Sequence, residues 1–281
     1  MIRQFKLRNE YSQEYSLSVP AAAFLYEPEG LGYEMDYSYL RLGYSWVRNY
    51  MKDAQQEITG SVVFTAADPY SANADFLRFI RRSAKLTLVY TTSVGEYLRD
   101  VDLVSYEKTE ITEGNVLECP IKLKARGLWY SNNVTRFSVE ISSDDDAKIY
   151  DYEFPYKYQG IVNGETTVYN DGSVSAPFRA SFMGPIANPK VILLVNGSEQ
   201  ARVEITGEAQ NGQTIEYSSV DGDLYCYLDA AGVQTNLVSG LNINYDNFFK
   251  IPVGESVLRF EADAQITQPI IVTVQKLFRA V

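Results

Sequence analysis

The chain has 281 residues, of which 46% are hydrophobic, and this is enough apolar content for two cores of ordinary domain size. It contains no histidine, which excludes Ser-His-Asp and Cys-His catalysis, imidazole general bases and histidine-containing zinc sites. The net charge is −11, with 16 basic and 18 acidic residues before position 141 and 9 basic and 18 acidic residues after it, which argues against nucleic acid as a partner.

The first 60 residues begin with an expected strand around Phe5 and Leu7 and continue into a stretch rich in tyrosine, since eight of the 22 tyrosines lie in the first 50 residues. Tyrosine combines apolar area with a polar tip, so this extended arm suits a partly wet contact surface. Two interpretations remain open, a subunit interface and a loop that packs on its own domain. The interface candidates are Tyr33, Tyr37, Tyr39, Tyr44 and Trp46.

The spacing from Ser71 to Lys85 predicts a short amphipathic helix. Its apolar face includes Phe76 and Ile80, whereas Arg78 and its basic neighbours lie on the opposite face. We expect that basic face to be solvated or to contact an acidic partner chain, because the sequence around it shows no phosphate-binding motif.

Alternating apolar residues then predict strands at 86–90, 101–104 and 117–124. With one short helix beside these strands, the first domain is predicted to be an α+β unit dominated by β, and the chain as a whole to be mainly β. Pro120 lies inside the third of these and predicts an edge strand or a bulge, because proline donates no backbone hydrogen bond. The segment ends at Trp129 and Tyr130, which we expect to pack against a neighbouring subunit or against the second domain.

The composition changes near Asp144–Asp146, and we place the boundary there, giving domains of residues 1–140 and 141–281. The aspartate triplet lacks the spaced ligands and glycine of a calcium loop, so we interpret it as a solvated linker that holds no metal.

The second domain is predicted to be a β-sandwich or jelly roll, because at least eight short apolar-alternating segments recur there without a helical pattern. All five Asn-Gly and Asp-Gly dipeptides of the chain lie in this half, and each predicts a tight hairpin turn. They are Asn163-Gly164, Asp171-Gly172, Asn196-Gly197, Asn211-Gly212 and Asp221-Gly222.

Motifs for nucleotide binding, thiol redox chemistry and a hydrolase nucleophile are missing from the sequence. Cys119 and Cys226 each lie in an alternating strand pattern, so we expect buried reduced thiols. No apolar run reaches the roughly 18 residues of a membrane span, and the first eight residues lack the apolar core of a signal peptide. We therefore expect a chain without a membrane span that folds in a cytoplasm.

Paired carboxylates are the one catalytic arrangement that remains, since a glycosidase needs only two. Asp221 with Asp223, and Glu261 with Asp263, are the available pairs. The first is better explained as a hairpin turn and the second as the wet face of a strand. We expect no enzyme, no catalytic residue and no cofactor.

The order of parts, with the Tyr-rich arm, the 71–85 helix, the GLWY segment and a jelly roll that contains NPKVILLVNG and FFKIPVGES, resembles the distal tail protein family of long, flexible-tailed bacteriophages. The resemblance spans the whole chain. It implies a first domain that builds a ring, usually a hexamer, between the tail tube and the tail-tip or baseplate hub, and a galectin-like β-sandwich that projects outward. The implied partners are the tail tube, tape-measure, tail-hub and receptor-binding or baseplate proteins, and the implied location is the virion tail.

A carbohydrate-binding module that recognises host glycans is the alternative function, because jelly-roll sandwiches often bind sugars. Galectin-type binding uses a histidine and a stacking tryptophan, but this chain has no histidine and both tryptophans precede residue 130. Other aromatics of the second domain remain available for stacking on a sugar, namely Tyr150, Tyr152, Tyr156, Tyr158, Tyr225 and Tyr227.

Overall fold

The computed structural model describes residues 3–137, 162–263 and 268–281. The described chain is mainly β and contains one α-helix, which confirms the predicted fold class. The expected boundary between residues 140 and 141, the Asp144–Asp146 triplet and four of the tyrosines proposed for sugar stacking lie outside the described residues.

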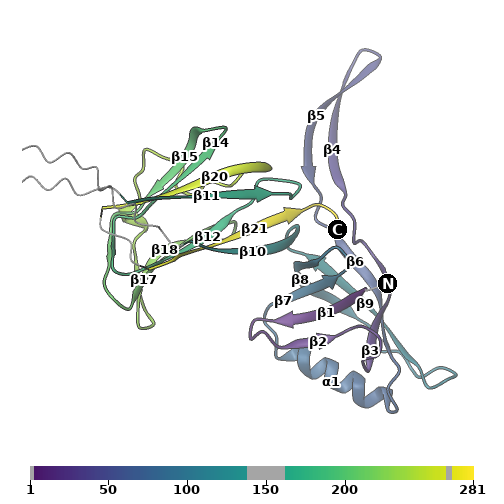
Figure 1. Cartoon of the computed structure of the whole chain (residues 1–281). Coiled ribbons are helices and arrows are strands. Elements are labelled where there is room, and N and C mark those ends of the chain that lie inside the picture. Colours follow the sequence, from purple (N-terminus) through teal and green to yellow (C-terminus); the bar gives the residue numbers. More distant parts are fainter. Residues whose placement is uncertain (1–2, 138–161, 264–267) are drawn as a thin grey trace, which may run out of the picture. The chain divides into compact units, whose positions relative to one another are not determined.

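Two compact units make up the chain (Figure 1). Unit 1 consists of Met1–Ser131 and Leu277–Val281, and unit 2 of Asn132–Lys276. Strands β10 (Trp129–Phe137) and β21 (Ile270–Phe278) each begin in one unit and end in the other. The last segment of unit 1, Leu277–Val281, therefore follows all of unit 2 in the sequence.

The sheet of unit 1 is antiparallel. Its long strand β8 pairs with β7 along its first half and with β9 along its second half. Beyond β7 the order continues to β1 and β2, and beyond β9 it continues to β6 and β3. The strands are β1 (Gln4–Asn9), β2 (Glu14–Ser16), β3 (Ala23–Glu29), β6 (Glu57–Phe64), β7 (Leu86–Thr91), β8 (Glu96–Tyr106) and β9 (Leu117–Ala125).

Alternation along these strands places one apolar face in a single core, which includes Leu7, Leu88 and Leu123. Trp129 is fully buried in this core and donates its indole Nε1–H to the carbonyl of Leu31 at 3.1 Å. The expectation that Trp129 packs against a neighbouring subunit or the other domain is therefore wrong. Its partner surface is the core of its own unit.

Pro120 does not mark an edge strand, because β9 lies between β6 and β8. The ladder between β8 and β9 ends at Ile121, immediately beside Pro120, and the Glu107 N–H donates to the Pro120 carbonyl at 3.0 Å. The ladder also contains a register shift between Leu103 and Ser105. The predicted bulge thus occurs in the partner strand, a few residues from the proline.

The predicted helix is present as α1 (Pro69–Arg81), and it begins two residues earlier and ends four residues earlier than the predicted range 71–85. The Asp68 carboxylate accepts hydrogen bonds from the backbone N–H groups of Tyr70 and Ser71, and Pro69 fits the first helical position. Phe76 is fully buried against the unit 1 core, which fixes the helix to the sheet.

Unit 2 is a β-sandwich whose two antiparallel sheets bury their facing side chains in one core. Phe178, Tyr217 and Val272 belong to one sheet, and Val191 and Phe260 to the other. The first sheet has the order β19-β18-β17-β12-β21-β10, with β12 (Phe178–Met183), β17 (Gln213–Val220), β18 (Asp223–Ala230) and β19 (Val233–Asn236). The second has the order β11-β20-β14-β15, with β11 (Val162–Asn170), β14 (Lys190–Val195), β15 (Ser198–Glu204) and β20 (Gly254–Ala262).

Short elements connect the two sheets: β13 (Ile186–Ala187) pairs with β16 (Glu208–Ala209), and η1 (Val238–Gly240) is a single 3₁₀ turn. Among the predicted turns, Asn196-Gly197 and Asp221-Gly222 are two-residue hairpin loops. Asn211-Gly212 is a turn that precedes β17, whereas Asp171-Gly172 follows the end of β11 and is a bend without a hairpin. The turn predicted at Asn163-Gly164 is wrong, because this dipeptide lies inside β11, where Asn163 pairs with Glu261.

Both cysteines are confirmed as buried free thiols, Cys119 in the unit 1 core and Cys226 in the unit 2 core. Burial raises the pKa of the Cys226 thiol to about 12, so this sulfur stays protonated and unreactive at neutral pH. No helix in the described part of the chain is both long and apolar enough to cross a membrane.

Candidate functional site

The Tyr-rich arm folds as a β-hairpin of β4 (Met35–Leu42) and β5 (Ser45–Asp53), which forms a two-stranded sheet of its own (Figure 1). Gly43, with φ +63°, and Tyr44 make the two-residue turn, and Arg41 Nε donates to the Gly43 carbonyl at 3.0 Å. Every residue of β5 is exposed, and β4 is exposed except for partial burial at Met35. The hairpin thus pairs its backbone without burying its side chains.

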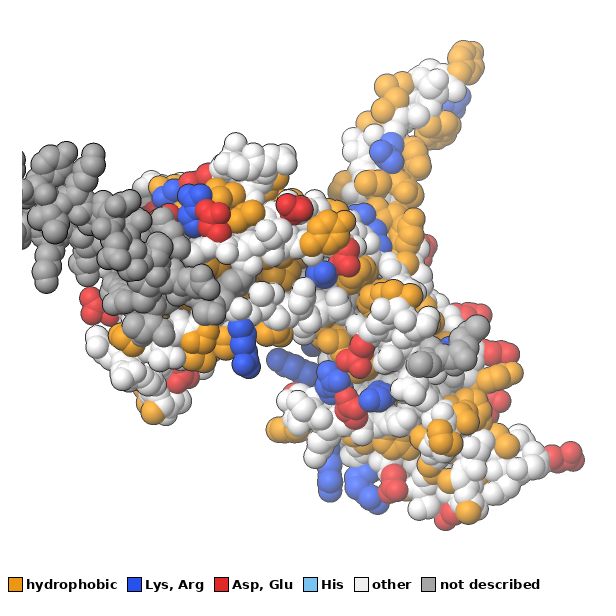
Figure 2. All heavy atoms as spheres, in the orientation of Figure 1, with side chains coloured by type: hydrophobic (Ala, Val, Ile, Leu, Met, Phe, Trp, Pro, Cys, Tyr) orange, Lys and Arg blue, Asp and Glu red, His pale blue; other side chains and the backbone are white. Residues whose placement is uncertain are grey.

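Apolar side chains lie on both faces of this hairpin, which Figure 2 shows as hydrophobic atoms along the exposed arm. One face carries Tyr37, Tyr39 and Trp46, with the Tyr37 and Tyr39 rings 6.1 Å apart and the Arg48 guanidinium 5.9 Å from the Tyr37 ring centre. The other face carries Leu40, Leu42, Val47 and Tyr50. A surface hairpin ordinarily has one polar face, whereas this one exposes apolar side chains on both faces.

The structure places all five interface candidates on this hairpin or at its base, and all are exposed. Tyr37, Tyr39 and Trp46 lie together on one face, Tyr44 lies at the tip, and Tyr33 precedes β4. The further apolar residues of the hairpin are Leu40, Leu42, Val47, Tyr50 and Met51. Tyr50 belongs to the predicted Tyr-rich stretch, whereas the two leucines, Val47 and Met51 were missed because the prediction weighed tyrosine content, although the spacing of Leu40 and Leu42 has the period of a strand.

Ion pairing and backbone hydrogen bonds fix the base of the hairpin. Arg279 donates to both carboxylate oxygens of Asp53, from Nε at 2.7 Å and from Nη2 at 3.3 Å, and this contact raises the pKa of the guanidinium. The Ala54 N–H donates to the Glu34 carbonyl at 3.0 Å, and Gln55 Nε2 donates to the Ala125 carbonyl at 3.0 Å. The exposed arm is therefore attached to unit 1 at several points.

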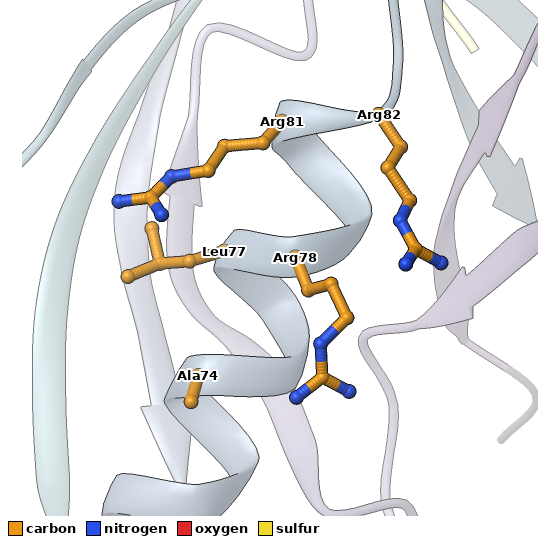
Figure 3. A pocket seen from close by; sticks show the side chains of 5 residues that line it. All are labelled: Ala74, Leu77, Arg78, Arg81 and Arg82. Atoms are coloured by element: carbon orange, nitrogen blue, oxygen red, sulfur yellow. The ribbon is translucent and has the colours of Figure 1, made fainter.

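A second exposed feature is the basic face of α1 (Figure 3). Ala74 and Leu77 form the apolar floor of a shallow hollow, and the side chains of Arg78, Arg81 and Arg82 surround it. Leu77 and Arg81 project to one side of the helix, and Arg78 and Arg82 to the other. Arg78 is paired with Asp75 at 2.9 Å. The face is basic and solvent-accessible, in agreement with the sequence pattern.

Three of the four carboxylates considered from the sequence make ion pairs or hydrogen bonds within the chain. Asp221, in the turn between β17 and β18, pairs with Lys250, and Asp223, at the start of β18, pairs with Arg179. Asp263 accepts a hydrogen bond from Asn188 Nδ2 at 2.8 Å. Among the described residues, no group of three or more Cys, Asp or Glu side chains is arranged to hold a metal ion.

Residues 4–126 match the family described as distal tail protein, N-terminal domain. This range contains the hairpin, α1 and nearly all of the unit 1 sheet. Unit 1 is thus a distal tail protein N-terminal domain, and the family resemblance seen in the sequence is confirmed. This match lies within unit 1 and ends before unit 2 begins. No curated protein sequence matches it.

Solved structures share the fold over nearly the whole chain. The phage P2 baseplate in its activated conformation with calcium contains a chain of 16% identity, with a TM-score of 0.67 and 100% of both chains covered. The same baseplate with strontium gives a TM-score of 0.66 at 16% identity, again over 100% of both chains. The SPP1 Dit protein, described as a paradigm of the hub adsorption apparatus in phages that infect Gram-positive bacteria, gives 0.61 at 11% identity over 97% of this chain and 98% of that one.

Proposed function

We propose that the chain assembles into a closed ring, of six subunits, that joins the tail tube to the tail-tip or baseplate hub. The observation that carries this proposal is the β4–β5 hairpin, which exposes apolar side chains on both faces. An isolated two-stranded hairpin is marginal in water, so a partner surface must supply the missing burial. A second copy is the natural partner, because head-to-tail contacts that close by rotation make rings.

The remaining partners follow from the distal tail family. We propose that the two rims of the ring contact the tail tube and the tail-hub and tape-measure proteins, and that unit 2, as a galectin-like domain, faces receptor-binding or baseplate proteins. Assembly takes place in the cytoplasm of the bacterial host. The basic face of α1, around Arg81 and Arg82, fits an acidic surface among these proteins.

Light scattering and negative-stain imaging of the purified chain test the ring. We expect closed rings for the wild type and monomers for the double variant Tyr44→Ser, Trp46→Ser, because both side chains are exposed and fill no internal core. Tyr169→Ser is the matched control, since Tyr169 is an exposed aromatic of unit 2, and it should leave the rings intact. A wild-type chain that remains monomeric at high concentration contradicts self-assembly.

Carbohydrate binding by unit 2 is the second candidate. Tyr225 and Tyr227 lie side by side on β18, with ring centres 5.0 Å apart, and both are partly exposed. Neighbouring rings of this kind can stack on a sugar. A glycan array probed with the full chain, and with Tyr225→Ser as the control, tests glycan binding. A signal that is lost in Tyr225→Ser supports glycan recognition. If no such signal is seen, assembly remains as the proposed function.

A further inference from the structure

Arg99 on β8 is the most deeply buried charge of the described chain, with 2% of its surface exposed. Burial lowers the pKa of its guanidinium to about 10, so the group still carries its charge at neutral pH. A buried cation is costly unless it is paired or fully hydrogen-bonded. The groups that contact the Arg99 guanidinium therefore show whether its charge is compensated within the chain.

The partners of Arg99 that the structure shows are all neutral. Nε donates to the Gly127 carbonyl at 2.9 Å, Nη1 donates to Gln56 Oε1 at 2.8 Å, and the guanidinium lies 5.3 Å from the centre of the Trp129 ring. No carboxylate in the described part of the chain lies within 4.0 Å of it. The charge is held in place by neutral groups and has no counter-ion.

Arg99 lines an open hollow of about 290 Å³ at the base of the β4–β5 hairpin. Its other walls include Gln55, Gly127 and the exposed Arg126. Asp53 also lines the hollow, but both of its oxygens accept hydrogen bonds from Arg279. Two arginines thus line a space whose only carboxylate is already paired, so the hollow has a surplus of positive charge.

We propose that this hollow is a carboxylate-binding site, and that an Asp or Glu side chain of a neighbouring copy of the chain occupies it in the assembled ring. The occupant rests on the function proposed above. Part of the hollow is formed by Asp53–Gln56, which continues directly from β5, so a neighbour that covers the hairpin also reaches the hollow. The chain has 36 acidic and 25 basic residues, so a second copy presents carboxylates in surplus. A guanidinium already oriented by its neighbours binds a carboxylate with little loss of conformational freedom.

The test fills the hollow and leaves Arg99 unchanged. A Cβ added at Gly127 meets no atom within 4 Å, so Gly127→Leu fits the backbone and adds bulk at a residue that lines the hollow. Gly95→Leu is the matched control, because a Cβ there makes only ordinary contacts with the Tyr97 ring and the site lies outside the hollow. Sedimentation velocity on the full chain then gives the dissociation constant of the ring.

We expect Gly127→Leu to weaken ring assembly by roughly 30-fold or more, as for a buried charge pair that loses one partner, and Gly95→Leu to leave it unchanged. Arg99→Gln should weaken assembly similarly. Acetate, titrated against chloride at constant ionic strength, should dissociate the wild-type ring by competing for the site.

The possible failures are distinguishable. Rings that form equally well in wild type and Gly127→Leu overturn this site and leave the proposed ring intact. If acetate raises the unfolding temperature of the wild type, but not of Gly127→Leu, while both form equal rings, the site binds free carboxylates and the neighbouring copy is not the occupant. A wild type without rings overturns the proposed function and this occupant together.

Discussion

The β4–β5 and β17–β18 hairpins have similar lengths, and each reverses through a turn that contains a glycine with positive φ, Gly43 at +63° and Gly222 at +77°. In the second hairpin Tyr217 is fully buried and Cys226 nearly so, because a second sheet covers that face. In the first, no residue is buried. Turn chemistry and backbone pairing therefore build a hairpin in either place, but only a second layer gives its side chains a core.

The largest expected difference between the two hairpins is the cost of losing an aromatic side chain. Tyr217 packs 5.3 Å from Phe178 and donates its hydroxyl to the Asn247 carbonyl at 2.7 Å. Tyr217→Ala should lower the free energy of unfolding by about 3–5 kcal/mol, because it leaves a cavity and an unpaired carbonyl. Urea unfolding followed by circular dichroism measures this. A loss below about 1 kcal/mol would contradict the sandwich core as described.

The next largest difference is expected for alanine substitution in the turns of the two hairpins. Alanine at a left-handed position costs about 1–2 kcal/mol, and both Gly43 and Gly222 occupy such positions with open space around them. Gly222→Ala should lower global stability by that amount, because β17 and β18 carry core residues. Gly43→Ala should leave the global unfolding midpoint unchanged and speed hydrogen exchange only in β4 and β5. Equal effects on global stability would show that the exposed hairpin unfolds together with unit 1.

The pH dependence is a smaller effect, confined to the covered hairpin. Burial raises the pKa of Glu216 above 4.5, although the hydrogen bond from the Ser181 hydroxyl opposes this. A carboxyl whose folded pKa is raised contributes stability that is present below its unfolded pKa and lost as the pH rises through its folded pKa. Relative to Glu216→Gln, the wild type should therefore lose stability as the pH rises from the unfolded pKa of a glutamate through the raised folded pKa of Glu216. Parallel stability curves for the two proteins would exclude this assignment.

The smallest expected effect is on the stability of the monomer when an aromatic side chain of the exposed hairpin is shortened to alanine. Trp46→Ala should change the free energy of unfolding by no more than about 0.5 kcal/mol, as for a surface substitution, because the indole fills no internal core. The same change should disrupt the ring. If thermal unfolding of dilute monomer shows a large loss, Trp46 packs within its own unit and the comparison between the hairpins fails.

Periodic features were predictable from the sequence. Period two along 86–90 and 117–124, and the helical spacing around Phe76, correspond to real elements because one face of each meets a core. The turns at Asn196-Gly197 and Asp221-Gly222 were predictable for a local reason, since those residues accept positive φ.

The failures have a common physical cause, namely information held by distant partners. Asn163-Gly164 remains in a strand because β20 pairs with it along the whole of β11, which overrides the local turn preference. The core position of Trp129 depends on the Leu31 carbonyl, 98 residues away in sequence. Arg99 was not predicted to be special, because nothing in its local sequence indicates a buried charge whose partners among the described residues are neutral.

The ion pair between Asp53 and Arg279 has a consequence for the order of events during synthesis. The two residues are separated by 226 positions, with all of unit 2 between them. On the ribosome the hairpin and its hydrogen bonds to Glu34 and Ala125 can form early, but the ion pair at its base forms only once unit 2 has been made. A chain interrupted within unit 2 would carry the aromatic arm without this ion pair at its base.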